Sequence, residues 1–275
     1  MGSNDIPPPS APTWLIPVST GALACGMLGW LGCYVLMIRR SLATKATPMP
    51  IIALGLNLSW EVVYAGYVTE MPIEMAGFVC WLAFNLGVLY ATLKTARYSF
   101  ASSPLVARNV GLILGVTFAA GLVINYVFAR WWFLEPHRGY GDKTGKSWKG
   151  SQARDATELA YWTAGVAQIP LSVGSIAMLL QRGHSGGHSY AIWFCRFFGT
   201  AMGLPVTNIL MWYYWPEAHQ YVFEPMSLII VGTSLVCDLV YPFVLAYVRS
   251  TERILPDRTV IAGDYHSRAV EDKTK

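Results

Sequence analysis

The sequence predicts an all-α integral membrane protein with seven transmembrane helices, its N-terminus lumenal and its C-terminus cytoplasmic. The first observation is composition, since 54% of the 275 residues are hydrophobic and only 13% are charged, whereas a soluble domain carries about 25% charged residues. The second is that apolar runs of membrane-spanning length follow one another along the whole chain. Backbone groups inside lipid must find their hydrogen-bond partners within the segment, so these runs are expected to be helices.

A helix needs roughly 20 apolar residues to cross a bilayer core. Seven segments meet this length: 13–38, 49–68, 72–93, 109–130, 156–180, 189–214 and 222–248. The chain is therefore expected to consist of a disordered N-terminal tail over residues 1–12, one membrane domain over 13–248 and a cytoplasmic tail over 249–275. The opening stretch "MGSNDIPPPSAPTW" contains no Lys or Arg before the first apolar run, so no cleavable signal peptide is expected.

The orientation follows from the distribution of basic residues, which are enriched in cytoplasmic loops. A lumenal N-terminus places most of them inside: Arg39, Arg40, Lys45, Lys94, Arg97, Arg108 and Arg182. The long loop over 131–155 disagrees, because it would be lumenal and yet is basic, with Arg138, Lys143, Lys146, Lys149 and Arg154. Two interpretations of this glycine-rich loop stay open, a flexible lid and a solvated linker.

Several classes of site are disfavoured. A formal charge of only +4, spread over loops, does not form the basic face that a nucleic-acid partner requires. The five cysteines lie inside apolar segments without CxxC spacing, which predicts neither a zinc site nor a disulfide framework. His184 and His188 in "RGHSGGHS" could resemble a metal pair, but the intervening Ser-Gly-Gly disfavours a helix there. We therefore expect no metal and no cofactor.

Two carboxyl groups stand out because an ionisable residue deep in a membrane span is costly and usually functional. Glu61 lies near the middle of the second span and Asp238 near the middle of the seventh. At 1.5 Å per residue, each is within about 4–5 Å of the membrane midplane. We therefore expect both carboxyl groups to face one central cavity.

Each acid has polar neighbours at helical spacing. Asn57, Glu61 and Tyr64 share one face of the second span, as Ser234, Asp238 and Tyr241 do on the seventh. Amides occur singly in the intervening spans, where interhelical hydrogen bonding is an alternative to a functional role; they are Asn125, Gln168 and Asn208.

Burial and a second carboxyl group nearby both disfavour ionisation, so at least one acid is expected to keep its proton at neutral pH. A protonated carboxyl group in a dry pocket is a general acid, which suits a lipophilic substrate activated by protonation. Aromatic faces stabilise cations, and Trp60, Tyr64 and Tyr241 are the aromatic residues closest in sequence to the two acids.

With these residues in place, the chain resembles the fungal membrane-bound terpene cyclases of meroterpenoid and indole-diterpene biosynthesis, the pyripyropene- and paxilline-type cyclases. The resemblance covers nearly the whole transmembrane region. It is carried by the ordered strings "NLSWEVVYA", "NLGVLYATLK", "LSVGSIAMLLQRG", "SYAIWFCRFFGT", "YYWPEAH" and "CDLVYPF".

The resemblance implies that Glu61 and Asp238 are the catalytic acids. It also implies a metal-free reaction in which the terminal epoxide of a prenylated aromatic, polyketide or indole substrate is protonated and the resulting carbocation cyclises. We expect Asn57, Trp60, Tyr64, Gln168 and Tyr241 to contact that substrate. The implied setting is the endoplasmic reticulum membrane, shared with a pathway epoxidase and a prenyltransferase.

Two other classes of function remain open from the residues alone. A small proton-coupled transporter could use the buried acids as a relay, with the in-span prolines breaking its helices; these are Pro170, Pro205 and Pro242. Against it, the two halves show no internal repeat. A retinal protein is disfavoured because the seventh span has no lysine for a Schiff base.

Overall fold

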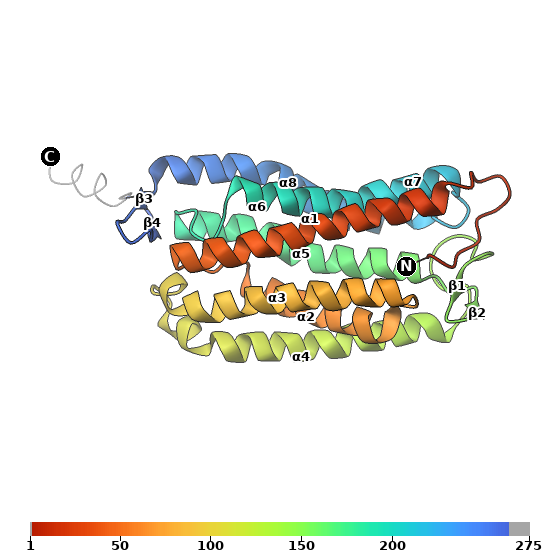
Figure 1. Cartoon of the computed structure of the whole chain (residues 1–275), viewed down its shortest axis with the longest axis horizontal. Coiled ribbons are helices and arrows are strands. Elements are labelled where there is room, and N and C mark those ends of the chain that lie inside the picture. The colour runs from red at the N-terminus through yellow and green to blue at the C-terminus, as the bar shows by residue number, and fades with distance from the viewer. Residues whose placement is uncertain (1, 264–275) are drawn as a thin grey trace.

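The computed structural model describes residues 2–263, and within them the protein is a bundle of long helices lying side by side along one axis (Figure 1). The longest helices are α1 (Leu15–Thr44), α2 (Ile51–Val63), α3 (Pro72–Ser99), α4 (Pro104–Leu134), α5 (Ala156–Arg182) and α8 (Pro225–Thr251). The shorter ones are η1 (Tyr64–Val68), α6 (Tyr190–Ala201), η2 (Met202–Val206), α7 (Thr207–Tyr214) and η3 (Gln220–Phe223). Two antiparallel pairs of two-residue strands complete the described chain: β1 (Ser147–Trp148) with β2 (Ser151–Gln152), and β3 (Arg253–Ile254) with β4 (Val260–Ile261).

The expected all-α membrane architecture is confirmed in its coarse form. Six helical segments of the described chain are long and apolar enough to cross a membrane: α1, α2 with η1, α3, α4, α5 and α8. The remaining expected span, 189–214, is the sixth in chain order and falls on α6, η2 and α7, which follow one another without a gap but do not form one continuous α-helix. Helices such as α1 and α3 continue several residues beyond the apolar runs that predicted them.

The break in the 189–214 segment has a local cause. Pro205 lies inside η2, which is a π-helical turn, and a proline removes one backbone donor and clashes with the preceding turn. The hydroxyl of Thr207 bonds to the Met202 carbonyl oxygen at 2.7 Å and so satisfies part of the interrupted ladder. Single π-turns of this kind often accompany functional sites.

The helices pack in a definite order. Helix α1 contacts α3 on one side and the α6–η2–α7 segment on the other, whereas α2 packs against α4 and α5, and α5 against α8. A Cβ atom on Gly26 would lie 2.9 Å from the Gly199 carbonyl oxygen, so only glycine permits this approach of α1 and α6. Small residues are typical of such contacts in membranes.

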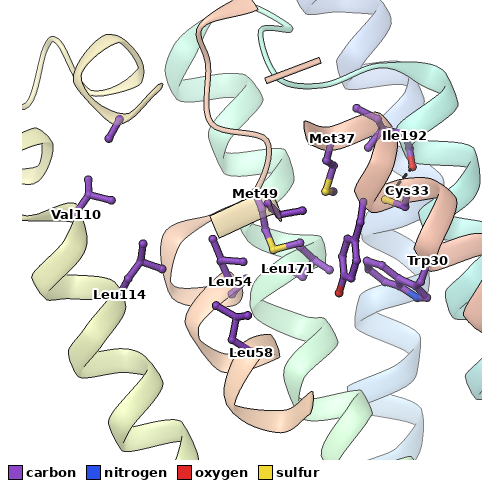
Figure 2. Packing of buried hydrophobic residues seen from close by; sticks show 14 residues of the cluster. Trp30, Cys33, Met37, Met49, Leu54, Leu58, Val110, Leu114, Leu171 and Ile192 are labelled. Atoms are coloured by element: carbon purple, nitrogen blue, oxygen red, sulfur yellow. Dashed lines mark hydrogen bonds between the residues drawn. The ribbon is translucent and has the colours of Figure 1, made fainter. Parts of the chain in front are cut away.

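The main apolar core joins α1, α2, α3, α4, α5 and α6. Figure 2 shows Met37 of α1, Met49, Leu54 of α2, Leu114 of α4 and Leu171 of α5 converging in it. The dashed line in the figure is the contact of the Cys33 thiol with the Ile192 carbonyl oxygen, which ties α1 to the start of α6. On α1 the core takes residues from Trp30 to Met37, so it lies beside the second half of that helix.

The opposite end of the bundle, where α1 begins, is covered by the N-terminal residues and by the 135–155 loop; we call this covering the cap (Figure 1). The β1–β2 hairpin in the loop turns through Lys149 and Gly150, both with positive φ, which is the requirement of a tight two-residue hairpin turn. The Trp148 indole stacks on Phe133 at 3.7 Å between ring centroids and donates to the Val68 carbonyl oxygen at 2.8 Å.

Buried ion pairs hold the cap together. The Lys146 ammonium group lies 2.8 Å from a carboxylate oxygen of Asp5 and 3.0 Å from Nε2 of His219. Lys143 contacts Asp155 at 2.9 Å and Glu158 at 2.5 Å. Burial opposes the charge on Lys146, but the carboxylates of Asp155 and Asp5 outweigh it and hold the pKa of Lys146 above its usual value.

Two expectations about this end of the protein are wrong. The tail over residues 1–12 is not disordered where the structure describes it, because Asp5 is buried in an ion pair and the Ile6 amide donates to the Gly145 carbonyl oxygen at 2.8 Å. The 131–155 loop is neither a solvated linker nor a free lid, because Lys143 and Lys146 are both 0% exposed. The sequence does not reveal these ion pairs, because their members are not neighbours in the chain; Asp5 and Lys146 are 141 residues apart.

The cap makes stability depend on pH. Burial, reinforced by the Lys146 ammonium group, lowers the pKa of His219 from 6.5 to about 3, so the folded protein keeps this imidazole neutral. Below pH 6.5 the unfolded chain takes up a proton that the folded chain does not, and stability falls as pH falls. The limiting slope is about 1.4 kcal/mol per pH unit.

The amide oxygen of glutamine in His219→Gln can still accept from Lys146. Between pH 7.5 and 5.0 we therefore expect the free energy of unfolding of this variant to fall by about 2 kcal/mol less than that of the wild-type protein. Thermal unfolding in detergent at several pH values measures this difference. Parallel pH profiles for the two proteins would contradict the assignment.

Candidate active site

A cavity of about 280 Å³ lies inside the bundle, bounded by α1, α2, α3, α5 and the α6–η2–α7 segment. On α1 its lining residues run from Thr20, near the cap, to Tyr34, a rise of roughly 21 Å along the helix axis. The side of the cavity formed by α1 and α3 is open, because Thr20 and Ala24 are exposed and Ile73 is 77% exposed. These exposed lining residues place the opening of the cavity between the first halves of α1 and α3.

Glu61 lies at the end of the cavity that is farther from the cap and is 1% exposed. The Tyr34 hydroxyl donates to Glu61 Oε1 at 3.0 Å, and the Asn85 amide nitrogen is 3.0 Å from both carboxyl oxygens. Within residues 2–263, no Lys, Arg or His forms an ion pair with Glu61. The carboxyl group therefore has neutral hydrogen-bond partners and access to the cavity.

Aromatic rings form the wall beside Glu61. Trp60 packs against Phe78 at 5.2 Å and against Trp81 at 6.0 Å between ring centroids, in edge-on arrangements, and all three line the cavity. Trp30 lines the opposite side, 5.6 Å from the Tyr34 ring. Aromatic rings beside a cavity can stabilise a positively charged species through their electron-rich faces.

The expected substrate contacts are divided between two places. Asn57, Trp60 and Gln168 line the cavity. Tyr64 does not line it: it is 0% exposed, and its hydroxyl bonds to Thr163 of α5 at 2.6 Å. Trp60 donates to the same Thr163 hydroxyl at 3.0 Å, so Tyr64 supports the aromatic wall from behind.

The expectation that Glu61 and Asp238 face one cavity is wrong. Asp238 does not line the cavity and instead accepts from the Arg196 guanidinium at 2.7 Å. Tyr241 is also away from it, with its hydroxyl 2.6 Å from Nδ1 of His188. The physical reason is the order of the helices around the bundle, because α8 packs on α5 and α6 and has no extensive contact with α2. Equal depth in the membrane therefore does not bring the two acids together.

Sequence reasoning missed the two partners of Glu61. Tyr34 is one of many tyrosines, and nothing local shows that α1 approaches α2 at that residue. Asn85 did carry a signal, as an amide within the apolar "NLGVLYATLK" stretch, because a buried amide in a span needs a partner. Arg196 also carried a signal, because a guanidinium inside a span needs to snorkel or to pair, but the sequence does not show which carboxylate it pairs with.

No cluster of three or more His, Cys, Asp or Glu side chains that could hold a metal ion occurs in the part of the chain that the structure describes. The side chains that approach the cavity are one carboxyl group, hydroxyl groups, amides and aromatic rings. Such a set can donate a proton and shield a cation.

A helical membrane bundle that encloses a carboxyl group beside an aromatic wall has the features of a membrane protein with an internal binding site. The comparison with known families is consistent with this class: residues 3–251 match the Pyr4-like transmembrane terpene cyclases, and the chain belongs to that family. It is therefore an integral, multi-pass membrane enzyme that carries out terpene cyclisation.

Among curated relatives, the terpene cyclase ascF of Acremonium egyptiacum is 34% identical over 258 residues, covering 94% of this chain and 92% of that protein. The terpene cyclase penB of Penicillium crustosum is 34% identical over 232 residues, covering 84% and 86%. The terpene cyclase ltmB of Epichloe festucae var. lolii is 32% identical over 216 residues, covering 78% and 85%. No solved structure matches the chain.

Proposed function

We propose that the protein is a metal-free, acid-initiated cyclase that opens the terminal epoxide of a prenylated aromatic, polyketide or indole substrate, with Glu61 as the proton donor. The observation that carries this proposal is the position of Glu61, which is buried at one end of an aromatic-lined cavity among neutral hydrogen-bond partners. An acid in such surroundings favours its uncharged form, which is the form that can donate.

The reaction is an isomerisation. The Glu61 O–H bond breaks as its proton moves to the epoxide oxygen, and the C–O bond to the more substituted carbon breaks, leaving a hydroxyl group and a tertiary cation. The π electrons of successive alkenes then form C–C bonds until a proton is lost. Donors from Tyr34 and Asn85 stabilise the carboxylate left on Glu61, because hydrogen bonds to a charged acceptor are stronger than those to a neutral one.

The shape of the cavity supports one orientation of the substrate. Glu61 lies at the end away from the cap, while the lipid-facing opening beside Ile73 lies nearer the cap. The epoxide end of the prenyl chain therefore enters first, past Trp60, Phe78 and Trp81, and the aromatic head group remains near the opening. Each cation formed along the chain then lies beside an aromatic face.

The membrane placement is part of the proposal. We propose seven crossings, with α6, η2 and α7 acting together as one of them, a lumenal N-terminus and a location in the endoplasmic reticulum beside a pathway epoxidase and a prenyltransferase. The basic 131–155 loop is the feature that disagrees with a lumenal N-terminus. Lys143 and Lys146 in it are buried against Asp155 and Asp5, so two of its charges are neutralised and the disagreement is smaller. A transporter is not favoured, since the family and its named relatives are cyclases.

The partners of Glu61 provide a test of the mechanism. We expect Asn85→Leu to lower kcat by roughly 10- to 100-fold with little change in KM, because a donor to a charged carboxylate contributes about 1.5–3 kcal/mol and Asn85 does not line the cavity. Tyr34→Phe should lower kcat to a similar extent. Steady-state turnover of an epoxidised farnesyl-arene in isolated membranes measures both.

Asn125→Leu is the matched control, because this amide also lies in a span but bonds to Ser59 and to the Gly121 carbonyl oxygen, away from Glu61. Wild-type kcat in Asn85→Leu would contradict the role of the amide. Equal losses in Asn85→Leu and Asn125→Leu would indicate a general effect of removing buried amides.

A further inference from the structure

Asp238 belongs to a second buried polar centre, separate from the cavity. Its Oδ1 atom accepts from Arg196 Nη2 at 2.7 Å, and Arg196 Nη1 donates to the Ser175 hydroxyl at 2.8 Å. Arg196 is 1% exposed and Asp238 is 0% exposed. The guanidinium also lies over the Tyr241 ring, 4.7 Å from its centroid. Arg196 of α6 thus connects α5, through Ser175, with α8, through Asp238 and Tyr241.

This centre sets the position of α6. The Trp193 indole, one turn before Arg196, donates to the backbone carbonyl oxygen of Asp238 at 2.7 Å. Gly199 and Thr200, one turn after Arg196, line the cavity. Asp238 therefore holds the helix that carries part of the cavity wall, while neither Asp238 nor Arg196 lines the cavity itself.

We propose that Asp238 is a positioning residue that acts through Arg196, and that it does not donate the proton in cyclisation. The Asp238 carboxyl group is 2.7 Å from the Arg196 guanidinium and does not line the cavity, so it is not placed to protonate a substrate there. Removing that charge leaves Arg196 without its counter-charge inside the bundle, which is strongly destabilising. Loss of Asp238 thus displaces α6 and the wall at Gly199 and Thr200.

The geometry distinguishes this role from that of a catalytic acid. If Asp238 donated the proton, activity lost on its substitution would not return when Arg196 is neutralised. If Asp238 only balances the charge of Arg196, neutralising Arg196 as well should restore activity. Neutralising both members of the pair is often tolerated in buried sites, because the cost of desolvating two charges disappears together with their attraction. The proposal refines the assignment of roles at the proposed site and rests on Glu61 being the donor.

The test is a double-mutant cycle on Arg196 and Asp238 in membranes, with an epoxidised farnesyl-arene as substrate. We expect Asp238→Asn and Arg196→Gln each to lower kcat/KM by about 10- to 100-fold and to lower the thermal midpoint. The double variant should recover to within about threefold of the wild-type protein in both quantities, because neither charge is then left buried without its partner. Glu61→Gln should not be rescued in the same background.

A product readout separates positioning from simple loss of folded protein. We expect the residual activity of the single variants to contain a larger fraction of partly cyclised products, because the wall carried by α6 has moved. An inactive but folded double variant would overturn the proposal, as would a double variant that does not accumulate or an Arg196→Gln variant with wild-type activity. If the wild-type protein leaves the epoxide unchanged, the proposed function fails, and the thermal midpoints of the cycle still test the pair.

Discussion

Replacing Glu61 by glutamine is expected to lower kcat on the order of 10²- to 10⁴-fold, the usual contribution of a positioned general acid. Glutamine has nearly the same shape and can still accept from Tyr34, so the fold should be retained. What the variant lacks is the proton. Glu61→Asp should keep part of the activity, because it retains an acid that is one methylene farther from the cavity.

The matched control for Glu61→Gln is Glu135→Gln, which makes the same chemical change at an exposed carboxyl group outside the helices. Turnover of the epoxide by equal amounts of membrane protein, with thermal midpoints recorded in parallel, measures the effect. A Glu61→Gln protein that is folded and retains wild-type kcat would show that the proton comes from elsewhere.

Replacing Lys146 by methionine is expected to destabilise the protein by about 3–5 kcal/mol, because it leaves Asp5 and Asp155 as buried carboxylates without this cation. Lys146 is 0% exposed and lies 2.8 Å from Asp5 and 3.7 Å from Asp155. For a protein of this size, such a loss corresponds to a thermal midpoint lowered by about 10 °C.

Lys149→Met provides the comparison, since this lysine is in the same loop but is exposed, and surface substitutions usually change stability by less than about 0.5 kcal/mol. Thermal unfolding of the two variants in detergent measures the difference. Equal midpoints for Lys146→Met and Lys149→Met would mean that the buried ion pairs of the cap do not stabilise it.

Local pattern was sufficient to predict the helices and the first acid. Runs of apolar residues locate spans because lipid imposes one length and one hydrogen-bonding solution on every crossing. Glu61 stands out as a candidate site residue because a carboxyl group in the middle of an apolar run has few structural explanations. Asn57 shares a helix face with Glu61, Trp60 is its aromatic neighbour, and Gln168 is a single amide in an apolar span; all three line the cavity.

Lateral packing was not available from the sequence. Depth in the membrane can be estimated by counting residues, but the order of helices around the bundle cannot, and it is this order that separates Asp238 from Glu61. The same limit hid the partners, since Tyr34 and Glu61 come from different helices, and Asp5 and Lys146 are 141 residues apart. Charges that looked free in the loop are neutralised only once the chain is folded.

The central claim is that cyclisation begins when Glu61 protonates an epoxide inside the cavity. Its most direct test is to supply the purified protein, reconstituted in lipid, with two prenylated arenes that differ only in having or lacking the terminal epoxide. We expect the epoxide to be converted to a cyclic isomer of unchanged mass with a new hydroxyl group, detected by mass spectrometry and NMR, and the alkene to remain unchanged. Equal cyclisation of both compounds, or an intact epoxide, would contradict the account.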